Sequence, residues 1–215
     1  MVAVDEWAAI QAASQLNVSW QQGAPLAASY DGTAAARTGL IGALQNPTNV
    51  YNTSPLSSTG SVAAGLAGAV TQMEANYFSP YHMHAAIGPS CGVADVRNTP
   101  DSATGIQATI WSGTQGVYQL QAAIAQLLGY GKAASKVQVT YVEASGCYGH
   151  NGADDAAADA ALLSQAVSAP VRVQWMRPDE HGWEPLGPAM YHTMQGGLDA
   201  SGNIVAWLST TFLSL

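Results

Sequence analysis

The stretch Val137-Gln-Val-Thr-Tyr-Val-Glu-Ala-Ser-Gly-Cys-Tyr-Gly-His-Asn-Gly-Ala-Asp-Asp-Ala156 places a β-strand, a glycine-rich turn and a helix in direct succession. Val137–Val142 is rich in β-branched and aromatic residues, which predicts a strand. Ala153–Val167 is rich in alanine and ends before Pro170, which predicts a helix. Between them, Ser145–Gly152 contains three glycines. Glycine permits positive φ angles and a close approach of the backbone to a ligand.

The turn Ser145–Gly152 has the composition of an anion-binding site. Backbone N–H groups in such a turn, together with a helix N-terminus, attract negative charge. Asp154 and Asp155 lie where a helix start favours acidic residues, which gives them a capping role. An ordinary left-handed turn without a ligand is the alternative. The spacing matches neither the dinucleotide fingerprint nor a P-loop, because no Lys-Ser or Lys-Thr pair follows the glycines.

A second turn, Trp111-Ser-Gly-Thr-Gln115, repeats this arrangement. It follows a predicted strand, Ile106–Trp111, and precedes a predicted helix, Gly116–Leu128, which Gly129 ends. The side-chain amide of Gln115 can both donate and accept hydrogen bonds. Two turns of small residues that each follow a strand predict one shared crevice outside the strand ends.

The remaining segments mix helices, strands and hairpins, which favours an α+β fold, a layered mixed sheet with helices. Asn46–Gly60 contains two prolines and many Ser, Thr and Asn residues and is the predicted linker. We therefore expect three segments, 1–45, 46–60 and 61–215. The other predicted elements are a helix capped by Asp5, a strand Val18–Trp20, helices Thr33–Leu44 and Ser61–Val70, strands Thr71–Phe78, Cys91–Val96 and Val171–Trp175, and a hairpin of Tyr191–Leu198 with Ile204–Thr210.

Composition excludes several classes of function. The net charge is −8 with only six Lys and Arg residues, so the chain offers no basic surface for a nucleic acid. No stretch reaches the roughly 20 apolar residues of a transmembrane helix, and the first residues do not form a signal peptide. Cys91 and Cys147 lack metal-type spacing. Charged residues make up only 9% of the chain, which indicates a neutral surface or one covered by other polypeptide segments.

Two further motifs admit both a functional and a structural interpretation. On a strand, His82 and His84 of Tyr81-His-Met-His84 would share one face, as two metal ligands can. No third ligand has a suitable spacing, so packing or hydrogen-bonding histidines are favoured. Arg177-Pro-Asp-Glu180, with His181 and Trp183, is expected to be a solvated turn with an internal salt bridge.

Six short motifs follow one another in a fixed order along the chain. They are Trp111–Gln115, Leu127–Gly129, Lys136–Val139, Gly146–Gly149, Ala161–Ser164 and Pro170–Trp175. In this order they resemble the molybdenum hydroxylases, the family of xanthine dehydrogenase and aldehyde oxidase, in their large molybdopterin-binding subunit. The similarity is strongest to the branch of isoquinoline 1-oxidoreductase, nicotinate dehydrogenase and periplasmic aldehyde dehydrogenase. It covers roughly residues 71 to 208, and residues 84 to 95 and 151 to 155 also match this branch.

The resemblance implies roles for these residues in binding the molybdenum cofactor. Gln115 is expected to hydrogen-bond an oxygen at the molybdenum, which no protein side chain ligates in this family. The amides around Cys147, Tyr148 and Gly149 are expected to line the oxo face of the metal. Gly152 stands near the position of a purine-contacting glutamate, which argues against a purine substrate. The full set of expected cofactor-binding residues is Gly113, Thr114, Gln115, Gly146, Cys147, Tyr148 and Gly149.

The resemblance also implies that this chain carries only part of an active site. The general-base glutamate of the family lies far towards the C-terminus, and Glu143, Glu180 and Glu184 do not occupy its motif. Residues 1–45 would be the end of a hammerhead-like N-terminal domain, and 61–215 an incomplete first molybdopterin-binding domain. We expect a piece of an enzyme, inactive alone, that hydroxylates an aldehyde or N-heterocycle carbon with oxygen from water.

The expected partners are the remainder of the molybdopterin subunit, a 2Fe–2S subunit and a c-type cytochrome subunit carrying haem c. The sequence itself does not determine the location; the family branch favours the periplasm, and the cytoplasm stays open as the alternative. Two other functions stay open. One is a non-catalytic scaffold or binding domain that retains the fold, and the other is a metal-dependent hydrolase that uses His82 and His84.

Overall fold

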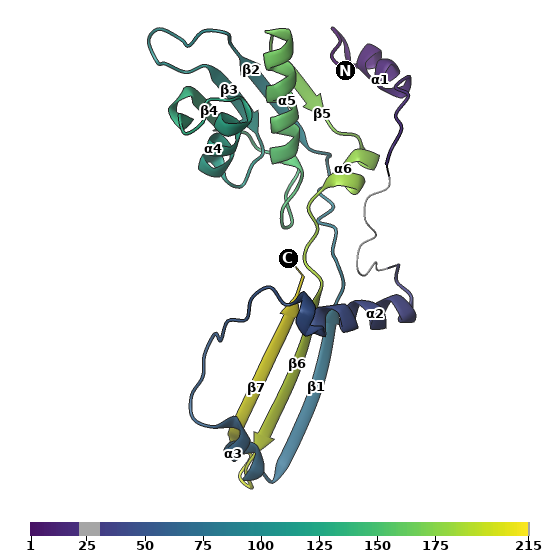
Figure 1. Ribbon diagram of the computed structural model, residues 1–215, viewed down its shortest axis with the longest axis vertical. Helices are drawn as coiled ribbons and strands as arrows, with labels where there is room; N and C mark the ends of the chain where they lie inside the picture. The colour runs from purple at the N-terminus through teal and green to yellow at the C-terminus, as the bar shows by residue number, and fades with distance from the viewer. Residues whose placement is uncertain (22–30, 215) are drawn as a thin grey trace. The chain divides into compact units, whose positions relative to one another are not determined.

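The structure is a computed structural model that describes residues 1–21 and 31–214. The chain forms two compact units (Figure 1). One consists of Met1–Gln21 and Met83–Leu186, and the other of Gln22–His82 and Gly187–Leu215. The predicted three segments 1–45, 46–60 and 61–215 concern domains of a longer polypeptide and stay a prediction.

The first unit is built on a four-stranded mixed sheet with the order β4-β3-β2-β5. The strands β3 (Ala108–Ser112) and β4 (Val137–Tyr141) run parallel, and α4 (Val117–Leu127) connects them. The strand β2 (Cys91–Val96) pairs antiparallel with β3 and with β5 (Val171–Gln174). The mixed sheet with helices confirms the predicted α+β class.

The helix α5 (Ala153–Val167) crosses this sheet and closes its core (Figure 1). Its alanines allow the close packing: a Cβ at Gly92 of β2 would lie 2.6 Å from the Ala157 backbone. The helix and the sheet are therefore densely packed, and there is no room between them for larger side chains. The buried core consists of Ala94, Val96, Ala108, Ile110, Leu120, Ile124, Ala125, Leu128, Val137, Ala157, Ala160 and Ala161.

Two short helices complete the first unit. The helix α1 (Glu6–Ser14) begins at Asp5, whose side chain accepts a hydrogen bond from Ala8 N, as predicted. The helix α6 (Arg177–Trp183) stands where a solvated turn was expected, and that prediction is wrong. Asp179 caps the helix by accepting from Met176 N. This capping signal is present in the sequence, but the prolines that follow the helix obscured it.

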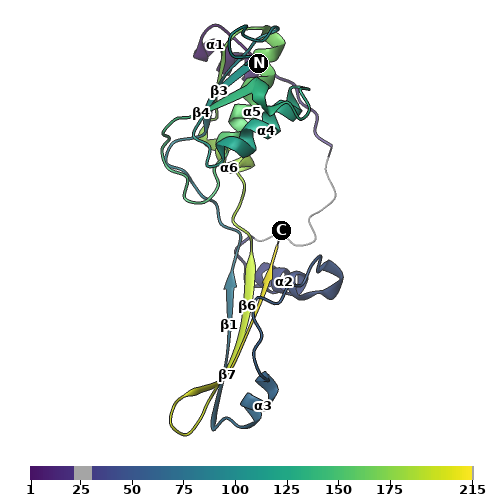
Figure 2. The ribbon, with the colours of Figure 1, turned by 90° about the vertical axis from the view of Figure 1, so that its left-hand side faces the viewer.

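The second unit is a three-stranded antiparallel sheet with the order β1-β6-β7. The strands are β1 (Thr71–Ser79), β6 (Met190–Leu198) and β7 (Ile204–Leu213), and the last two form the predicted hairpin. Helix α3 (Val62–Ala67), capped by Ser61, packs on β7, where a Cβ at Gly65 would lie 2.4 Å from Val205 O. The unit also contains α2 (Ala34–Gln45) and the 3-10 turn η1 (Pro47–Asn49). Figure 2 shows α2 and α3 on the same side of this sheet.

Most predicted elements are confirmed to within about two residues, with a few exceptions. The helix expected to reach Val70 ends at Ala67. Val18–Trp20 forms no strand, since no neighbouring segment pairs with it in the described residues. A 3-10 turn, η2 (Ala134–Lys136), precedes β4. In residues 1–21 and 31–214, no helix is both long and apolar enough to cross a bilayer.

Candidate functional site

The two predicted turns lie at the same edge of the four-stranded sheet. Because β3 and β4 are parallel neighbours, their carboxyl ends meet there, with Ser112 paired to Tyr141. Each strand is followed by a turn and then by a helix, α4 after β3 and α5 after β4. The carboxyl edge of parallel strands is where ligands bind in many α/β sheets.

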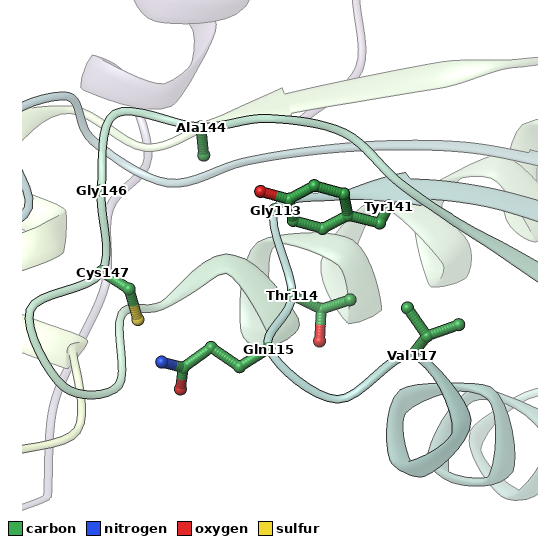
Figure 3. Close-up of a pocket in the computed structure, with 8 residues that line it drawn as sticks. All are labelled: Gly113, Thr114, Gln115, Val117, Tyr141, Ala144, Gly146 and Cys147. Carbon is green, nitrogen blue, oxygen red and sulfur yellow. The ribbon is translucent and has the colours of Figure 1, made fainter.

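Between the turns lies an open pocket with a volume of about 460 Å³ (Figure 3). Both turns contribute to its lining, which confirms the prediction that they share one crevice. Of the seven expected site residues, Gly113, Thr114, Gln115, Gly146 and Cys147 line the pocket, and Tyr148 and Gly149 lie in the same turn behind them. The sequence did not single out Val117, Tyr141 and Ala144, which also line it. Their only signal was adjacency to the turns.

The turn Ser145–Gly152 has the left-handed conformations that its glycines predict. The φ angle is +93° at Gly146 and +147° at Gly149. Tyr148, which is not glycine, is also left-handed with φ of 54°. Residues held in such conformations are strained and concentrate at functional sites. Gly152 differs: its φ is −80°, and a Cβ there would lie 2.4 Å from the Trp175 ring.

Hydrogen bonds fix both ends of this turn. The Ser145 hydroxyl accepts from Gly88 N at 2.7 Å and donates to Gly88 O at 2.9 Å. Asn151 donates to Gly146 O and accepts from Ala153 N, and thereby satisfies an N–H at the start of α5. Asp154 and Asp155 occupy the first turn of α5, as predicted, although neither side chain caps it.

The acidic start of α5 carries an electrostatic cost. Partial burial raises the pKa of Asp155 above its ordinary value, and the charges of Asp154 and Asp159 raise it further. His150 opposes this shift, and its ring lies 3.8 Å from the Asp154 carboxylate. None of these carboxylates lines the pocket. The site therefore keeps a lining without acidic side chains in a strongly acidic chain.

The shorter turn presents an amide to the pocket. A Cβ at Gly113 would lie 2.6 Å from Ala144 Cβ, so glycine lets the two turns approach each other. Thr114 is buried, and its hydroxyl accepts from Gly116 N at 3.0 Å. The side chain of Gln115 is exposed and extends towards Cys147 in Figure 3.

The donors of this pocket fit an anionic or oxygen-rich group. Within the part of the chain that the structure describes, the backbone N–H groups of the lining residues Gln115 and Cys147 have no protein acceptor, and neither has that of Tyr148, which follows Cys147 in the turn. Backbone N–H groups next to left-handed residues form anion-binding concavities. The lining holds no charged side chain, so recognition rests on neutral donors. These features match what a cofactor with phosphate and oxo groups requires.

The two histidines do not form the metal pair that a strand would give. His82 makes an isolated bridge to Gly187, and the described segment around both histidines is irregular, so the strand on which they would share one face does not form. His84 Nδ1 instead lies 2.7 Å from His150 O. In residues 1–21 and 31–214, no three His, Cys, Asp or Glu side chains are grouped as metal ligands. The hydrolase hypothesis has no observation in its favour.

The polar segment after β5 is structural and partly buried. Arg177 donates to Ala86 O at 2.8 Å and also to Ile87 O. Glu180 is fully buried and accepts from both Ser90 N, at 2.8 Å, and Ser90 Oγ, at 3.0 Å. The expected internal salt bridge is absent because Arg177 binds carbonyl oxygens instead. Sequence reasoning missed these long-range contacts, since each joins residues about 90 positions apart.

Comparison with known proteins agrees with this geometry. Residues 43–214 match the molybdopterin cofactor-binding domain. The chain is 40% identical over 207 residues to a subunit of nicotinate dehydrogenase from Pseudomonas putida, and the match covers 96% of this chain. The chain spans only 16% of the length of that relative.

Solved structures show the same fold. Aldehyde oxidoreductase from Desulfovibrio gigas superposes with a TM-score of 0.58 and 15% identity, covering 72% of this chain and 16% of that one. Quinoline 2-oxidoreductase from Pseudomonas putida 86 gives a TM-score of 0.56 and 15% identity, covering 70% of this chain and 18% of that one. With the sequence match over residues 43–214, the conclusion is that this chain belongs to the molybdopterin cofactor-binding domain family of the molybdenum hydroxylases.

Proposed function

We propose that this chain is one part of a molybdopterin-dependent oxidoreductase that hydroxylates a C–H carbon of an N-heterocycle or aldehyde with oxygen from water. One observation carries the proposal: two turns far apart in the sequence, both expected to face the cofactor, line one pocket with unpaired N–H donors. A scaffold that had lost its cofactor would have no need to keep those donors exposed.

Specific residues would hold the cofactor. The Gln115 amide and the N–H groups of Cys147 and Tyr148 would donate to its oxygens, and Gly113, Thr114, Gly146 and Gly149 would shape the surface against it. When bound, the molybdenum group supplies the two-electron redox chemistry that amino-acid side chains lack. The chain itself binds and orients, since donors fixed before binding lose little freedom on binding.

The thiol of Cys147 is engaged within the turn in this arrangement. Its sulfur lies 3.0 Å from Gly149 O, to which it donates. This hydrogen bond joins two residues of the same turn and uses the proton of the thiol. We therefore assign Cys147 a binding role through its backbone, and no nucleophilic role.

Among N-heterocycles, a substrate other than a purine is favoured. The relative that is 40% identical is named nicotinate dehydrogenase, and nicotinate is an N-heterocycle. Gly152 is fully buried against Trp175, so this position has no room for a side chain that contacts a substrate. An aldehyde remains the second substrate class, since an aldehyde oxidoreductase shares the fold.

The proposed partners follow from the family. The relative from Pseudomonas putida is named as one subunit of its enzyme, which supports an assembly of several polypeptides. We propose contacts with the remainder of the molybdopterin subunit and with a 2Fe–2S subunit that receives electrons. A c-type cytochrome subunit carrying haem c and a periplasmic location are further parts of this proposal, and cell fractionation with haem staining tests both.

Molybdenum and pterin analysis tests the proposed function. The intact enzyme that contains this chain is expected to hold the cofactor, whereas the 215-residue chain alone is expected to be inactive. In the intact enzyme, Gln115→Ala is expected to lower turnover at least tenfold. Gln126→Ala, an exposed change on α4 outside the pocket, is the matched control and is expected to have no effect. An intact wild-type enzyme without molybdenum would overturn the proposal in favour of a scaffold.

A further inference from the structure

A loop outside the pocket holds the longer turn in its shape. The loop Met83–Ser90 precedes β2, and it contacts the turn Ser145–Gly152 at both ends. At one end the Ser145 hydroxyl bonds both polar backbone groups of Gly88. At the other end His84 Nδ1 lies 2.7 Å from His150 O. Since a carbonyl oxygen only accepts, His84 Nδ1 must carry the proton and donate it.

The ring of His84 also packs directly on the turn. A Cβ at Gly149 would lie 2.0 Å from His84 Cδ2 and 2.3 Å from His84 Nε2. The imidazole therefore fills the space that a side chain at position 149 would need. Gly149 and His84 fit each other, and the φ of +147° at Gly149 is compatible only with this bare backbone.

The loop is itself anchored, so that it can act as a rigid support. Arg177 at the start of α6 donates to Ala86 O and Ile87 O. Beyond the end of α6, Glu184 accepts from Ala85 N at 3.3 Å. Ala85 has a φ of 51°, which a residue with a Cβ rarely adopts unless its surroundings hold it. These contacts come from buried or half-buried side chains and fix the backbone that directly follows His84.

We infer that His84 is a positioning residue that sets the conformation of Ser145–Gly152, and through it the donors of the pocket. The consequence for cofactor binding rests on the proposed function, whereas the contacts between His84 and the turn do not. The hydrogen bond from His84 reaches His150, one residue from Gly149 and two from Tyr148. Without this hydrogen bond, fewer contacts hold Tyr148 in its strained conformation. The N–H groups of Cys147 and Tyr148 then lose their fixed direction.

Three substitutions separate the hydrogen bond from the packing. His84→Asn keeps a donor nitrogen directly on Cγ, the place that Nδ1 occupies in histidine. His84→Gln moves the amide nitrogen one bond farther from the backbone, to the place of Nε2. His84→Ala removes the donor and the ring. Hydrogen–deuterium exchange of the peptide 144–156 in the 215-residue chain reports on the turn without any cofactor, because this peptide includes the hydrogen-bonded N–H groups of Gly152, Ala153 and Ala156.

We expect His84→Gln and His84→Ala to speed exchange in peptide 144–156 about tenfold, since one charge-free hydrogen bond contributes up to about that factor. His84→Asn is expected to retain the wild-type rate there. Peptides of the β6–β7 hairpin, which lies in the other unit, serve as the internal control for folding. The inference is overturned if His84→Asn exchanges like His84→Gln, whether both are fast or both match the wild type.

Metal analysis of the intact enzyme gives the second readout. Loss of molybdenum in His84→Gln with retention in His84→Asn supports the inference, and equal molybdenum in both contradicts it. Failure of the proposed function looks different, because the wild-type enzyme would then lack molybdenum while the exchange pattern of the chain persisted.

Discussion

The two turns that form the pocket are held in opposite ways. The turn after β3 is short, and its internal hydrogen bond joins Thr114 to Gly116, two residues apart. The turn after β4 is long, and its contacts reach residues 57 and 66 positions away in the chain. The turn after β3 is therefore determined by local contacts, whereas the turn after β4 depends on the tertiary structure of the unit. Substitutions should test this difference through the free energy of unfolding.

Gly149→Ala is expected to have the largest effect. The new Cβ meets the His84 ring at 2.0 Å, and the residue keeps a φ of +147°. Strain of about 1–3 kcal/mol and overpacking of about 1–3 kcal/mol give an expected destabilisation of about 4 kcal/mol. Gly131→Ala is the control, because Gly131 has a φ of +61° with nothing within 4 Å. Urea denaturation of both variants checks the difference, and equal losses would contradict the close fit with His84.

Glu180→Ala is expected to follow, with a loss of about 3 kcal/mol. It leaves Ser90 N and Ser90 Oγ without their buried acceptor, and each orphaned polar group costs about 1–3 kcal/mol. Glu180→Gln keeps an acceptor for Ser90 N and should lose less than half as much. Both losses come from a residue that does not line the pocket. Glu180 also accepts from Gly152 N, the last residue of the long turn, at 3.5 Å. Equal stability of the alanine variant and the wild type in urea denaturation would therefore contradict the claim that the long turn depends on distant contacts.

Thr114→Val tests the local turn. The valine has nearly the same shape but offers no acceptor to Gly116 N. The expected destabilisation is about 1 kcal/mol, the contribution of a single hydrogen bond. Exchange in peptide 144–156 should stay unchanged, since this contact does not reach the longer turn. A rise in the exchange rate of that peptide would show that the two turns are coupled.

Gln115→Ala is expected to change stability least, by less than about 0.5 kcal/mol, since the side chain is exposed. Thermal denaturation of the chain measures this small effect. The same substitution is expected to lower the turnover of the intact enzyme at least tenfold. A large loss of stability would mean that the amide supports the fold and would weaken its assignment to the cofactor.

The sequence predicts the parts of this structure that local signals control. The strand, turn and helix around Ser145–Gly152 follow from side-chain pattern and glycine content, and α5 begins and ends at the predicted residues. The shared crevice follows from parallel strands ending at one edge. These features depend on the chain order and on backbone preferences, both of which can be read in the sequence.

Long-range contacts escape such reasoning. The sequence around Arg177 and Glu180 predicted a solvated turn, because no residue close to them in the chain indicates that their partners are Ala86 O and Ser90. A packing or hydrogen-bonding role was predicted for His84 and is confirmed, but its partner could not be identified, because the acceptor is a backbone carbonyl 66 residues away. Every residue has a backbone carbonyl, so the sequence does not show which carbonyl a side chain will bind.

The three-stranded sheet of the second unit has a practical consequence for handling the chain. Its outer strands β1 and β7 each have one neighbour, and β7 exposes Ile204, Trp207 and Leu208. An edge strand with apolar side chains and few charges is a template for pairing with another strand. Expressed alone, the chain should self-associate as its concentration rises, and coexpression with the polypeptides of the proposed enzyme should keep it in solution.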